Sequence, residues 1–406
     1  MKWEKVKLGD IATFSNGINF NKTAYAKGIK LIGVSNFGDR FYPDYSQLQE
    51  VKKDIVRLED CLRNGDIVFV RSNGNKELVG RCMLVKNPTE RVTYSGFCIR
   101  ARLNDTDRYD PVYFTYYFKS KAFRRAVSGT AVGANIQNLS QARLSNHECR
   151  IPSIEVQHRI ADILSVYDDL IENNQKQIKL LEEAAQRLYK EWFVDLRFPG
   201  HENTKIVDGV PEGWRVASIA DICDTVGGGT PSTKIQSYYE KGDILWVTPT
   251  DITRNFSLAL LDTEKKITPE GLKNSSAKML PAETILMTSR ASVGFFGMCK
   301  YEVCTNQGFI SCIPKKENLQ MYLLFNLKSR VEEIRQKAGG STYLEISKTV
   351  FRELKIILPK DEVLAEYQKN VHVIFDEIYC RTEMIKSLVD MRNRLLPKLM
   401  SGEVEV

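Results

Sequence analysis

The chain has 406 residues, of which 43% are hydrophobic and 27% are charged, proportions typical of a soluble globular protein with two or three domains. This composition excludes a disordered or collagen-like chain, and apolar runs as short as Ile67–Val70 cannot cross a bilayer. The net charge is +7, but residues 1–150 alone carry 25 Lys and Arg against 15 Asp and Glu. This local excess of positive charge permits binding to a polyanion.

The cysteines and the start of the chain indicate its compartment. The nine cysteines form no C-x-x-C pair, and Met1–Lys5 lacks the apolar stretch of a signal peptide. We therefore expect reduced thiols, a cytoplasmic location and no membrane association.

The chain nearly repeats itself with a period of about 210 residues. The matching segments occur in the same order in both halves: Trp3-x4-Leu8-x-Asp10-Ile11 and Trp214-x4-Ile219-x-Asp221-Ile222, Gly96-Phe97 and Gly308-Phe309, Ile151-Pro152 and Leu358-Pro359, and Gln157 and Gln368. Such a repeat predicts two similar domains.

Each repeat begins with about 150 residues of short β-like runs, which Gly, Asn, Pro and Ser separate. The predicted strands are Lys30–Val34, Asp66–Val70, Thr93–Arg100, Ile244–Val247, Thr284–Thr288 and Phe309–Ile313. One helical stretch follows in each repeat, near Pro111–Ala126 and near Leu319–Lys337. This alternation predicts an α+β globule in each half.

Each repeat ends in a long helix. From Gln157 to Trp192 there is no Gly or Pro, and apolar positions recur at alternating steps of four and three, as in a coiled coil. The first seam contains Ile160, Leu164, Tyr167, Ile171, Asn174, Ile178, Leu181 and Leu188, and the second contains Val371, Phe375, Ile378, Ile385, Val389, Leu396 and Leu399. The polar Asn174 is expected to fix the register, and Pro397 is expected to bend or end the second helix.

The matching seams favour pairing of the two helices, antiparallel and related by a pseudo-two-fold axis. The predicted division is a globular domain over 1–152, a spacer helix over 153–196, a linker over 197–213, a second globular domain over 214–359 and a C-terminal spacer helix over 360–403.

Sequence signatures of catalysis are absent. There is no Gly-Lys dipeptide of a phosphate-binding loop, no Asp/Asn-Pro-Pro-aromatic motif of amino-methyltransferases, and no metal-ligand spacing among the four histidines. The run Gly227–Thr230 fits either a phosphate cradle or a turn that needs positive φ.

Four segments together resemble the specificity (S) subunit of type I restriction–modification systems. They are Gly227-Gly-Gly-Thr-Pro-Ser232 with Tyr238-Tyr239 and Trp246-Val-Thr248, Thr305-Asn-Gln-Gly-Phe309, Pro152-x4-Gln157-x2-Ile160-Ala161, and Arg394-Leu-Leu-Pro-Lys-Leu-Met-Ser-Gly-Glu403. The first globule departs from the pattern, with Ser15-Asn-Gly-Ile-Asn-Phe20 and Tyr94-Ser-Gly-Phe97 in the matching places.

The resemblance implies a non-catalytic subunit whose two globules are target recognition domains. Each would read one half of a bipartite, asymmetric site in double-stranded DNA. The paired helices would set the spacer and dock two methyltransferase (modification) subunits, which two restriction (motor–nuclease) subunits would join. This chain would bind no cofactor or metal, because S-adenosylmethionine, ATP and Mg are implied for the partner subunits.

Loops rich in groups that bind phosphates or base edges are the candidate DNA contacts. In the first domain they are Asn16, Asn19, Asn21, Lys22, Arg71, Ser72, Asn73, Asn75, Lys76, Asn135, Gln137 and Asn138. In the second domain they are Thr230, Ser232, Lys234, Thr248, Thr250, Asp251, Ser289, Arg290, Ser292, Ser341, Thr342 and Tyr343. Arg71 and Arg290 are favoured, because Arg bound to guanine is the commonest specific contact.

Two other functions remain open from the sequence. A self-sufficient nucleic-acid-modifying enzyme would transfer methyl groups as an isolated chain. A coiled-coil adaptor that binds only protein would leave its assembled complex without salt-sensitive DNA binding.

Overall fold

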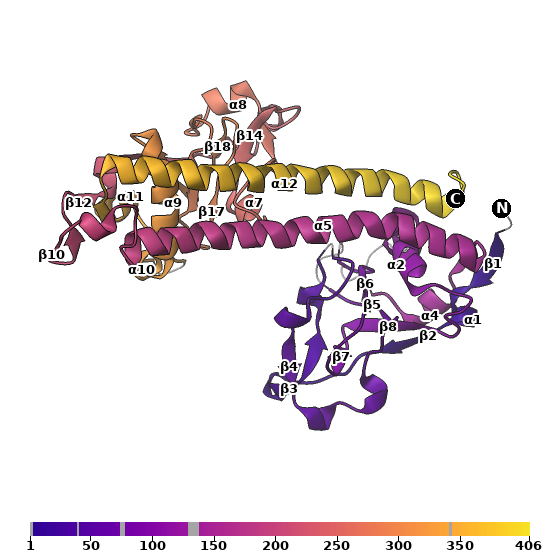
Figure 1. Cartoon of the computed structure of the whole chain (residues 1–406). Coiled ribbons are helices and arrows are strands. Elements are labelled where there is room, and N and C mark those ends of the chain that lie inside the picture. Colours follow the sequence, from indigo (N-terminus) through magenta and orange to yellow (C-terminus); the bar gives the residue numbers. More distant parts are fainter. Residues whose placement is uncertain (1–2, 39, 74–77, 129–137, 341–342) are drawn as a thin grey trace. The chain divides into compact units, whose positions relative to one another are not determined.

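The computed structural model describes residues 3–38, 40–73, 78–128, 138–340 and 343–406 (Figure 1). Two units divide the chain: the first contains Met1–Ile171 and Leu388–Val406, and the second contains Glu172–Ser387. Each unit therefore combines one globular domain with part of each long helix.

The strands of the first unit are β1 (Glu4–Lys7), β2 (Ala12–Asn16), β3 (Tyr25–Ile32), β4 (Gln49–Val51), β5 (Ile67–Val70), β6 (Cys82–Leu84), β7 (Val92–Tyr94), β8 (Cys98–Leu103) and β9 (Glu148–Ile151). They form a four-stranded antiparallel sheet in the order β2-β8-β5-β6, a three-stranded sheet in the order β4-β3-β7, and the pair β1-β9. Only β3 and β7 run parallel among these described pairs. Strand β5 is buried along its whole length, as its run of apolar residues requires.

The helices of the first domain are α1 (Leu8–Ile11), α2 (Pro111–Lys119), α3 (Lys121–Ser128) and α4 (Gln141–Ser145). Helix α2 begins where Asp110 accepts hydrogen bonds from the backbone N–H groups of Val112 and Tyr113 at 2.6 and 3.3 Å. The proline that follows Asp110 suits the first helical position because it has no N–H to satisfy. The aromatic side chains of α2 then pack into the core of the domain.

The second unit repeats this plan. Its strands are β10 (Ile206–Val207), β11 (Val210–Pro211), β12 (Arg215–Ser218), β13 (Cys223–Gly227), β14 (Ile244–Val247), β15 (Lys266–Ile267), β16 (Ile285–Thr288), β17 (Phe296–Gly297), β18 (Cys304–Thr305), β19 (Phe309–Pro314) and β20 (Lys355–Leu358). The sheet orders β13-β19-β16-β17, β15-β14-β18 and β12-β20 correspond strand for strand to those of the first unit. The pair β10-β11 is a short hairpin within the segment predicted as a linker.

The helices of the second domain are α6 (Ile219–Ile222), α7 (Pro249–Thr253), α8 (Pro269–Lys273), α9 (Gln320–Ser329), α10 (Val331–Gln336) and α11 (Lys348–Arg352). Four of them, α6, α9, α10 and α11, take the places that α1, α2, α3 and α4 take in the first domain. The predicted duplication and α+β class are confirmed.

Two predicted strands were wrong in their bounds: Lys30–Val34 corresponds to β3, which covers Tyr25–Ile32, and a second predicted strand is divided in two. The run 93–100 was expected to be continuous, but β7 ends at Tyr94 and β8 begins at Cys98. The backbone N–H of Cys98 donates to the carbonyl of Ser95 at 2.8 Å and closes a tight turn between the strands. This turn allows β7 to pair with β3 while β8 pairs with β2 and β5.

The two long helices are α5 (Ile154–Tyr189), which continues as a π-helical turn over Lys190–Val194, and α12 (Asp361–Ser401). Within the second unit, the Arg381 guanidinium donates to Asn174 at 3.1 Å, and the Tyr367 hydroxyl donates to the Ala185 carbonyl at 3.4 Å. The later residue of α5, Ala185, thus contacts the earlier residue of α12, Tyr367. The two helices are therefore antiparallel within this unit. Within the first unit, Arg392 of α12 pairs with Asp168 of α5.

The seam positions are largely buried against their own units. Buried are Ile160, Leu164, Ile171, Asn174, Ile178, Val371, Phe375, Ile378, Ile385, Leu396 and Leu399, whereas Tyr167, Leu181, Leu188 and Val389 are partly buried. Pro397 lies inside α12, so it does not end the helix, which continues to Ser401. Pro397 and Asn393 are both exposed. The Asn393 carbonyl that the proline leaves without a helical N–H partner can therefore be hydrated.

The repeated glutamines Gln157 and Gln368 have the same role in the two units. Gln157 accepts a hydrogen bond from the backbone N–H of Asp110 at 3.0 Å, and Gln368 accepts one from Met321 at 2.9 Å. Each glutamine thereby fixes the start of the domain's main helix, α2 or α9, to a long helix. A leucine in either place would leave a buried N–H without a partner.

None of the helices in the described part of the chain is both long enough and apolar enough to span a membrane.

Candidate nucleic-acid interface

In the first domain, the ends of several strands meet at one turn, Ser95–Phe97, which we call the domain 1 tip. The backbone N–H of Arg71 donates to the Phe97 carbonyl at 2.8 Å, and the Arg71 guanidinium donates to the Gly96 carbonyl at 3.3 Å. The Gly96 N–H donates to the Ile18 carbonyl at 2.7 Å. The loop after β2 and the loop after β5, both predicted to contact DNA, therefore lie against the same turn.

A fourth segment joins the domain 1 tip. Leu139 donates its backbone N–H to the Arg71 carbonyl at 2.9 Å, and Ser72 and Asn138 form an isolated β-bridge. Four segments far apart in the sequence thus bring exposed amides and a guanidinium together.

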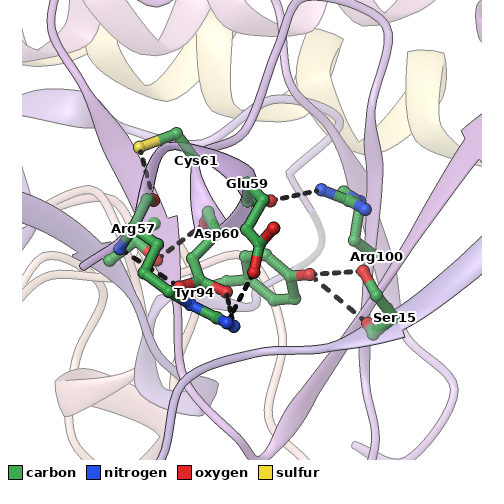
Figure 2. Close-up of polar contacts among 8 residues, drawn as sticks. Ser15, Arg57, Glu59, Asp60, Cys61, Tyr94 and Arg100 are labelled. Atoms are coloured by element: carbon green, nitrogen blue, oxygen red, sulfur yellow. Dashed lines mark hydrogen bonds and ion pairs between the residues drawn. The ribbon is translucent and has the colours of Figure 1, made fainter. Parts of the chain in front are cut away.

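The domain 1 tip rests on a polar cluster, shown in Figure 2. The hydroxyl groups of Tyr94 and Ser15 are 2.7 Å apart, which joins the end of β7 to β2 directly below the tip. Burial raises the pKa of Tyr94, so its hydroxyl stays protonated, and it also donates to the Ser15 carbonyl at 3.4 Å. On β8, the strand that follows the tip, Arg100 donates to the Glu59 carbonyl at 3.1 Å (Figure 2).

The remaining residues of the cluster fix the neighbouring loop. Arg57 binds Asp60 through its side chain at 3.0 Å, and this hydrogen bond lowers the pKa of the Asp60 carboxyl. The Asp60 carbonyl in turn accepts from the Thr93 hydroxyl at 2.9 Å on β7. The tip is consequently supported from two sides by hydrogen bonds that do not depend on DNA.

Glycine is required below each tip by close approach of backbone carbonyls. A Cβ on Gly17 would lie 2.2 Å from the Tyr94 carbonyl oxygen, and one on Gly228 would lie 2.1 Å from that of Thr305. Gly228 is not among the residues with positive φ. The explanation of Gly227–Thr230 by positive φ was therefore wrong, and steric room is the reason for glycine at position 228.

In the second domain, Asn306–Gly308 forms the corresponding turn, the domain 2 tip. The Thr230 hydroxyl donates to the Gln307 side-chain carbonyl, and the Ser289 N–H donates to the Gly308 carbonyl at 2.8 Å. Next to Ser289, the Arg290 guanidinium lies over the Tyr343 ring, 4.5 Å from its centroid, and donates to its hydroxyl. Arg290 also lies 3.6 Å from the Glu345 carboxylate.

The strand registers correct the sequence alignment of the repeats by one residue. Val70 pairs with Cys98, and Thr288 pairs with Phe309. The structural equivalent of Phe309 is therefore Cys98, and the equivalent of Phe97 is Gly308. Phe309 is a buried core residue, whereas Phe97 is exposed at the tip.

The candidate DNA contacts differ widely in accessibility. Exposed are Asn16, Asn19, Asn21, Lys22, Asn138, Thr230, Ser232, Lys234 and Tyr343; partly buried are Arg71, Ser72, Asn73, Thr248, Thr250, Asp251, Arg290 and Ser292. Ser289 is buried, and Thr248 and Asp251 cap α7 through a side-chain hydrogen bond of 2.6 Å. Asn75, Lys76, Asn135, Gln137, Ser341 and Thr342 lie outside the described residues.

Sequence reasoning missed two side chains at the tips, Phe97 and Gln307. Both stood in segments that were noticed as motifs, but a phenylalanine in a β-like run is ordinarily a core residue. Only the strand register reveals that Phe97 belongs to the turn.

Clusters of metal ligands are absent from the described residues. No group of three His, Cys, Asp or Glu side chains among them could hold a metal ion. All nine cysteines are free, and burial raises the pKa of Cys98, Cys149 and Cys304 to about 12, which keeps them as unreactive thiols.

Comparisons with known proteins agree with this picture. The family model described as "Type I restriction modification DNA specificity domain" matches residues 1–183 and 211–388. The chain is 25% identical over 475 aligned positions to the HindI specificity subunit of Haemophilus influenzae, covering 99% of both proteins. It is 38% identical over 173 residues to the MjaIX specificity subunit of Methanocaldococcus jannaschii, covering 42% of this chain and 39% of that protein.

The fold is also similar to a solved structure. The crystal structure of a type I restriction–modification S subunit from M. genitalium aligns with 98% of this chain and 96% of that one, at a TM-score of 0.56 and 16% identity.

Proposed function

Since the chain belongs to the type I restriction modification DNA specificity family, and is thus the non-catalytic DNA specificity subunit of such a system, we propose that its two domains each read one half of a bipartite DNA site. The observation that carries this proposal is the pair of tips. The same strand order supports both, yet their sequences differ: the first tip, Ser95–Phe97, exposes the Phe97 ring, and the second, Asn306–Gly308, exposes the Gln307 side chain. A common frame with different side chains suits two half-sites of different sequence.

Arg71 and Arg290 are the proposed base readers of the two domains. Each follows a buried central strand, and each has its guanidinium directed to a tip or an exposed ring by a named contact. Exposed amides and hydroxyls beside them, such as Asn16, Asn19 and Thr230, would bind phosphates or neighbouring bases. The positive charge of residues 1–150 would add affinity independent of sequence.

The paired helices would set the spacer and dock two modification subunits, to which two restriction subunits would bind. The contacts between α5 and α12 within each unit support pairing. This chain would itself bind no cofactor, while S-adenosylmethionine would act in the modification subunits and ATP with Mg in the restriction subunits. Nine free thiols suit a cytoplasmic location.

The test is co-expression of the chain with the methyltransferase encoded beside its gene, followed by methylome sequencing of host DNA. A bipartite motif methylated on both strands supports the proposal and gives both half-sites and the spacer. A stable complex that methylates no motif contradicts DNA reading by these domains.

A further inference from the structure

The side chain of Phe97 is 62% exposed, although the backbone around it is held in place. Its carbonyl accepts hydrogen bonds from Arg71 and Ser72, at 2.8 and 3.4 Å, and the next residue, Cys98, is completely buried. The fixed backbone therefore holds the Phe97 ring at the surface and does not allow it to turn into the core. An apolar ring fixed in water in this way retains its full tendency to bind an apolar partner.

The fold itself does not need an aromatic residue at this position. The equivalent residue in the second domain is Gly308, which is buried, and a Cβ there would lie 2.8 Å from Pro249. The strands on either side of Gly308 pair in the same order as those around Phe97. Phe97 thus distinguishes the two tips without contributing to the common frame.

Polar groups that suit base edges lie against Gly96, the residue before Phe97. The Arg71 guanidinium is bonded to the carbonyl of Gly96, the residue before Phe97. Asn19 lies against the other side of Gly96, since its side-chain oxygen is 2.0 Å from where a Cβ would stand. If Arg71 and Asn19 contact bases in the major groove, the Phe97 ring beside them enters the same groove. The only apolar group on the major-groove edges of the bases is the thymine methyl.

Resting on the proposed function, we propose that Phe97 packs against the 5-methyl group of a thymine in the half-site read by the first domain. Phe97 is then a specificity residue that selects thymine by apolar contact beside the hydrogen bonds of Arg71. The second domain, with Gly308 in that place, makes no equivalent contact and reads its half-site through polar groups.

The experiment uses the full chain in complex with its modification subunits and the duplex found by methylome sequencing. Each thymine of the first half-site is replaced in turn by deoxyuridine, which pairs identically but lacks the methyl group. We expect one replacement to weaken binding by about fourfold, the effect of one buried methyl. Phe97→Ala weakens binding to the unmodified site by about 5–30-fold and is insensitive to that same replacement.

Leu58→Ala is the matched control. Leu58 is 70% exposed in the same domain but lies outside the tip, so its removal takes away similar apolar surface and leaves both binding and the deoxyuridine effect unchanged. Thermal melting of both variants at the wild-type temperature excludes a folding defect.

The proposal is overturned if no deoxyuridine weakens binding of the wild-type complex, or if Phe97→Ala keeps the same sensitivity. A second outcome also overturns the proposal. If 2-aminopurine placed in the first half-site becomes more fluorescent only when Phe97 is present, and deoxyuridine has no effect, the Phe97 ring inserts between base pairs instead. A wild-type complex that selects no bipartite motif is a different result, because it contradicts the proposed function itself.

Discussion

The ion pair between Asp168 of α5 and Arg392 of α12 offers a direct test of how the long helices are held within the first unit. The side chains are 10% and 16% exposed, and the second oxygen of Asp168 accepts the Tyr116 hydroxyl at 2.5 Å. Asp168 therefore joins α2, α5 and α12. Replacing Arg392 by methionine keeps an unbranched chain of similar length but leaves the carboxylate with one neutral partner.

Removal of one member of a buried pair costs about 3–5 kcal/mol. Because Asp168 retains Tyr116 and some contact with water, we expect about 3 kcal/mol in Arg392→Met, at the lower end of this range. The opening free energy of the first unit falls by that amount. Amide hydrogen exchange of its core, in α2 for example, then accelerates by about 150-fold, since every 1.4 kcal/mol corresponds to a factor of ten.

The assay is hydrogen exchange with mass spectrometry on the full chain, which resolves the two units by their peptides. Lys176→Met is the control, because Lys176 pairs with Glu172 in an exposed i,i+4 contact, with side chains 69% and 49% exposed. Such pairs contribute little, and exchange should change by less than about fivefold. Exchange of α2 at the wild-type rate in Arg392→Met would show that this contact does not hold α12 in the first unit.

Three further predictions concern the tips and the spacer. Arg290→Ala weakens specific binding by about 1–3 kcal/mol and relaxes one base of one half-site, as a binding-selection assay would measure; an unchanged preference contradicts the role of Arg290. Gly228→Ala forces its Cβ against the Thr305 carbonyl and abolishes reading of the second half-site, whereas Gly339→Ala, with open space around it, leaves the selected site unchanged. Insertion of one heptad near Asn174 and one at the matching place in α12 changes the preferred spacer and leaves both half-sites intact, so a preserved spacer in the methylome refutes the proposed ruler role.

The parts of the fold that follow from local periodicity were predictable. The seams of α5 and α12 repeat over many turns, so the pattern reports helix and buried face together. Gln157 and Gln368 were recognisable as equivalents because both stand near the start of such a helix. The end of α12 was less predictable, since the cost of Pro397 depends on whether the Asn393 carbonyl reaches water, and the sequence does not state this.

The tips depend on contacts that no local pattern records. Residues 93–100 read as one strand because Val92–Tyr94 is β-prone and Cys98–Leu103 alternates between buried apolar residues and arginines. The turn between them exists because β7 and β8 belong to different sheets, and the residues that pair with them in β3, β2 and β5 lie 28 to 91 positions away in sequence. The need for glycine at position 228 likewise comes from the carbonyls of Thr305 and Asn306.

This division between local and non-local information has a functional counterpart. Core positions such as Phe309 and its equivalent Cys98 are both buried, so the frame accepts only residues that fit its interior. The neighbouring position differs between the domains. Phe97 faces water, so its side chain can change without loss of the frame, whereas Gly308 is buried and a Cβ there would lie 2.8 Å from Pro249. In the first domain, two adjacent residues therefore have different constraints. Cys98 must fit the core for folding, whereas Phe97 can differ according to the half-site that the domain reads. Exchanging whole tripeptides would cost stability, because a Cβ at Gly96 would lie 2.0 Å from Asn19 and one at Gly308 would lie 2.8 Å from Pro249. Replacement of the exposed Phe97 alone is instead expected to disturb recognition more than stability.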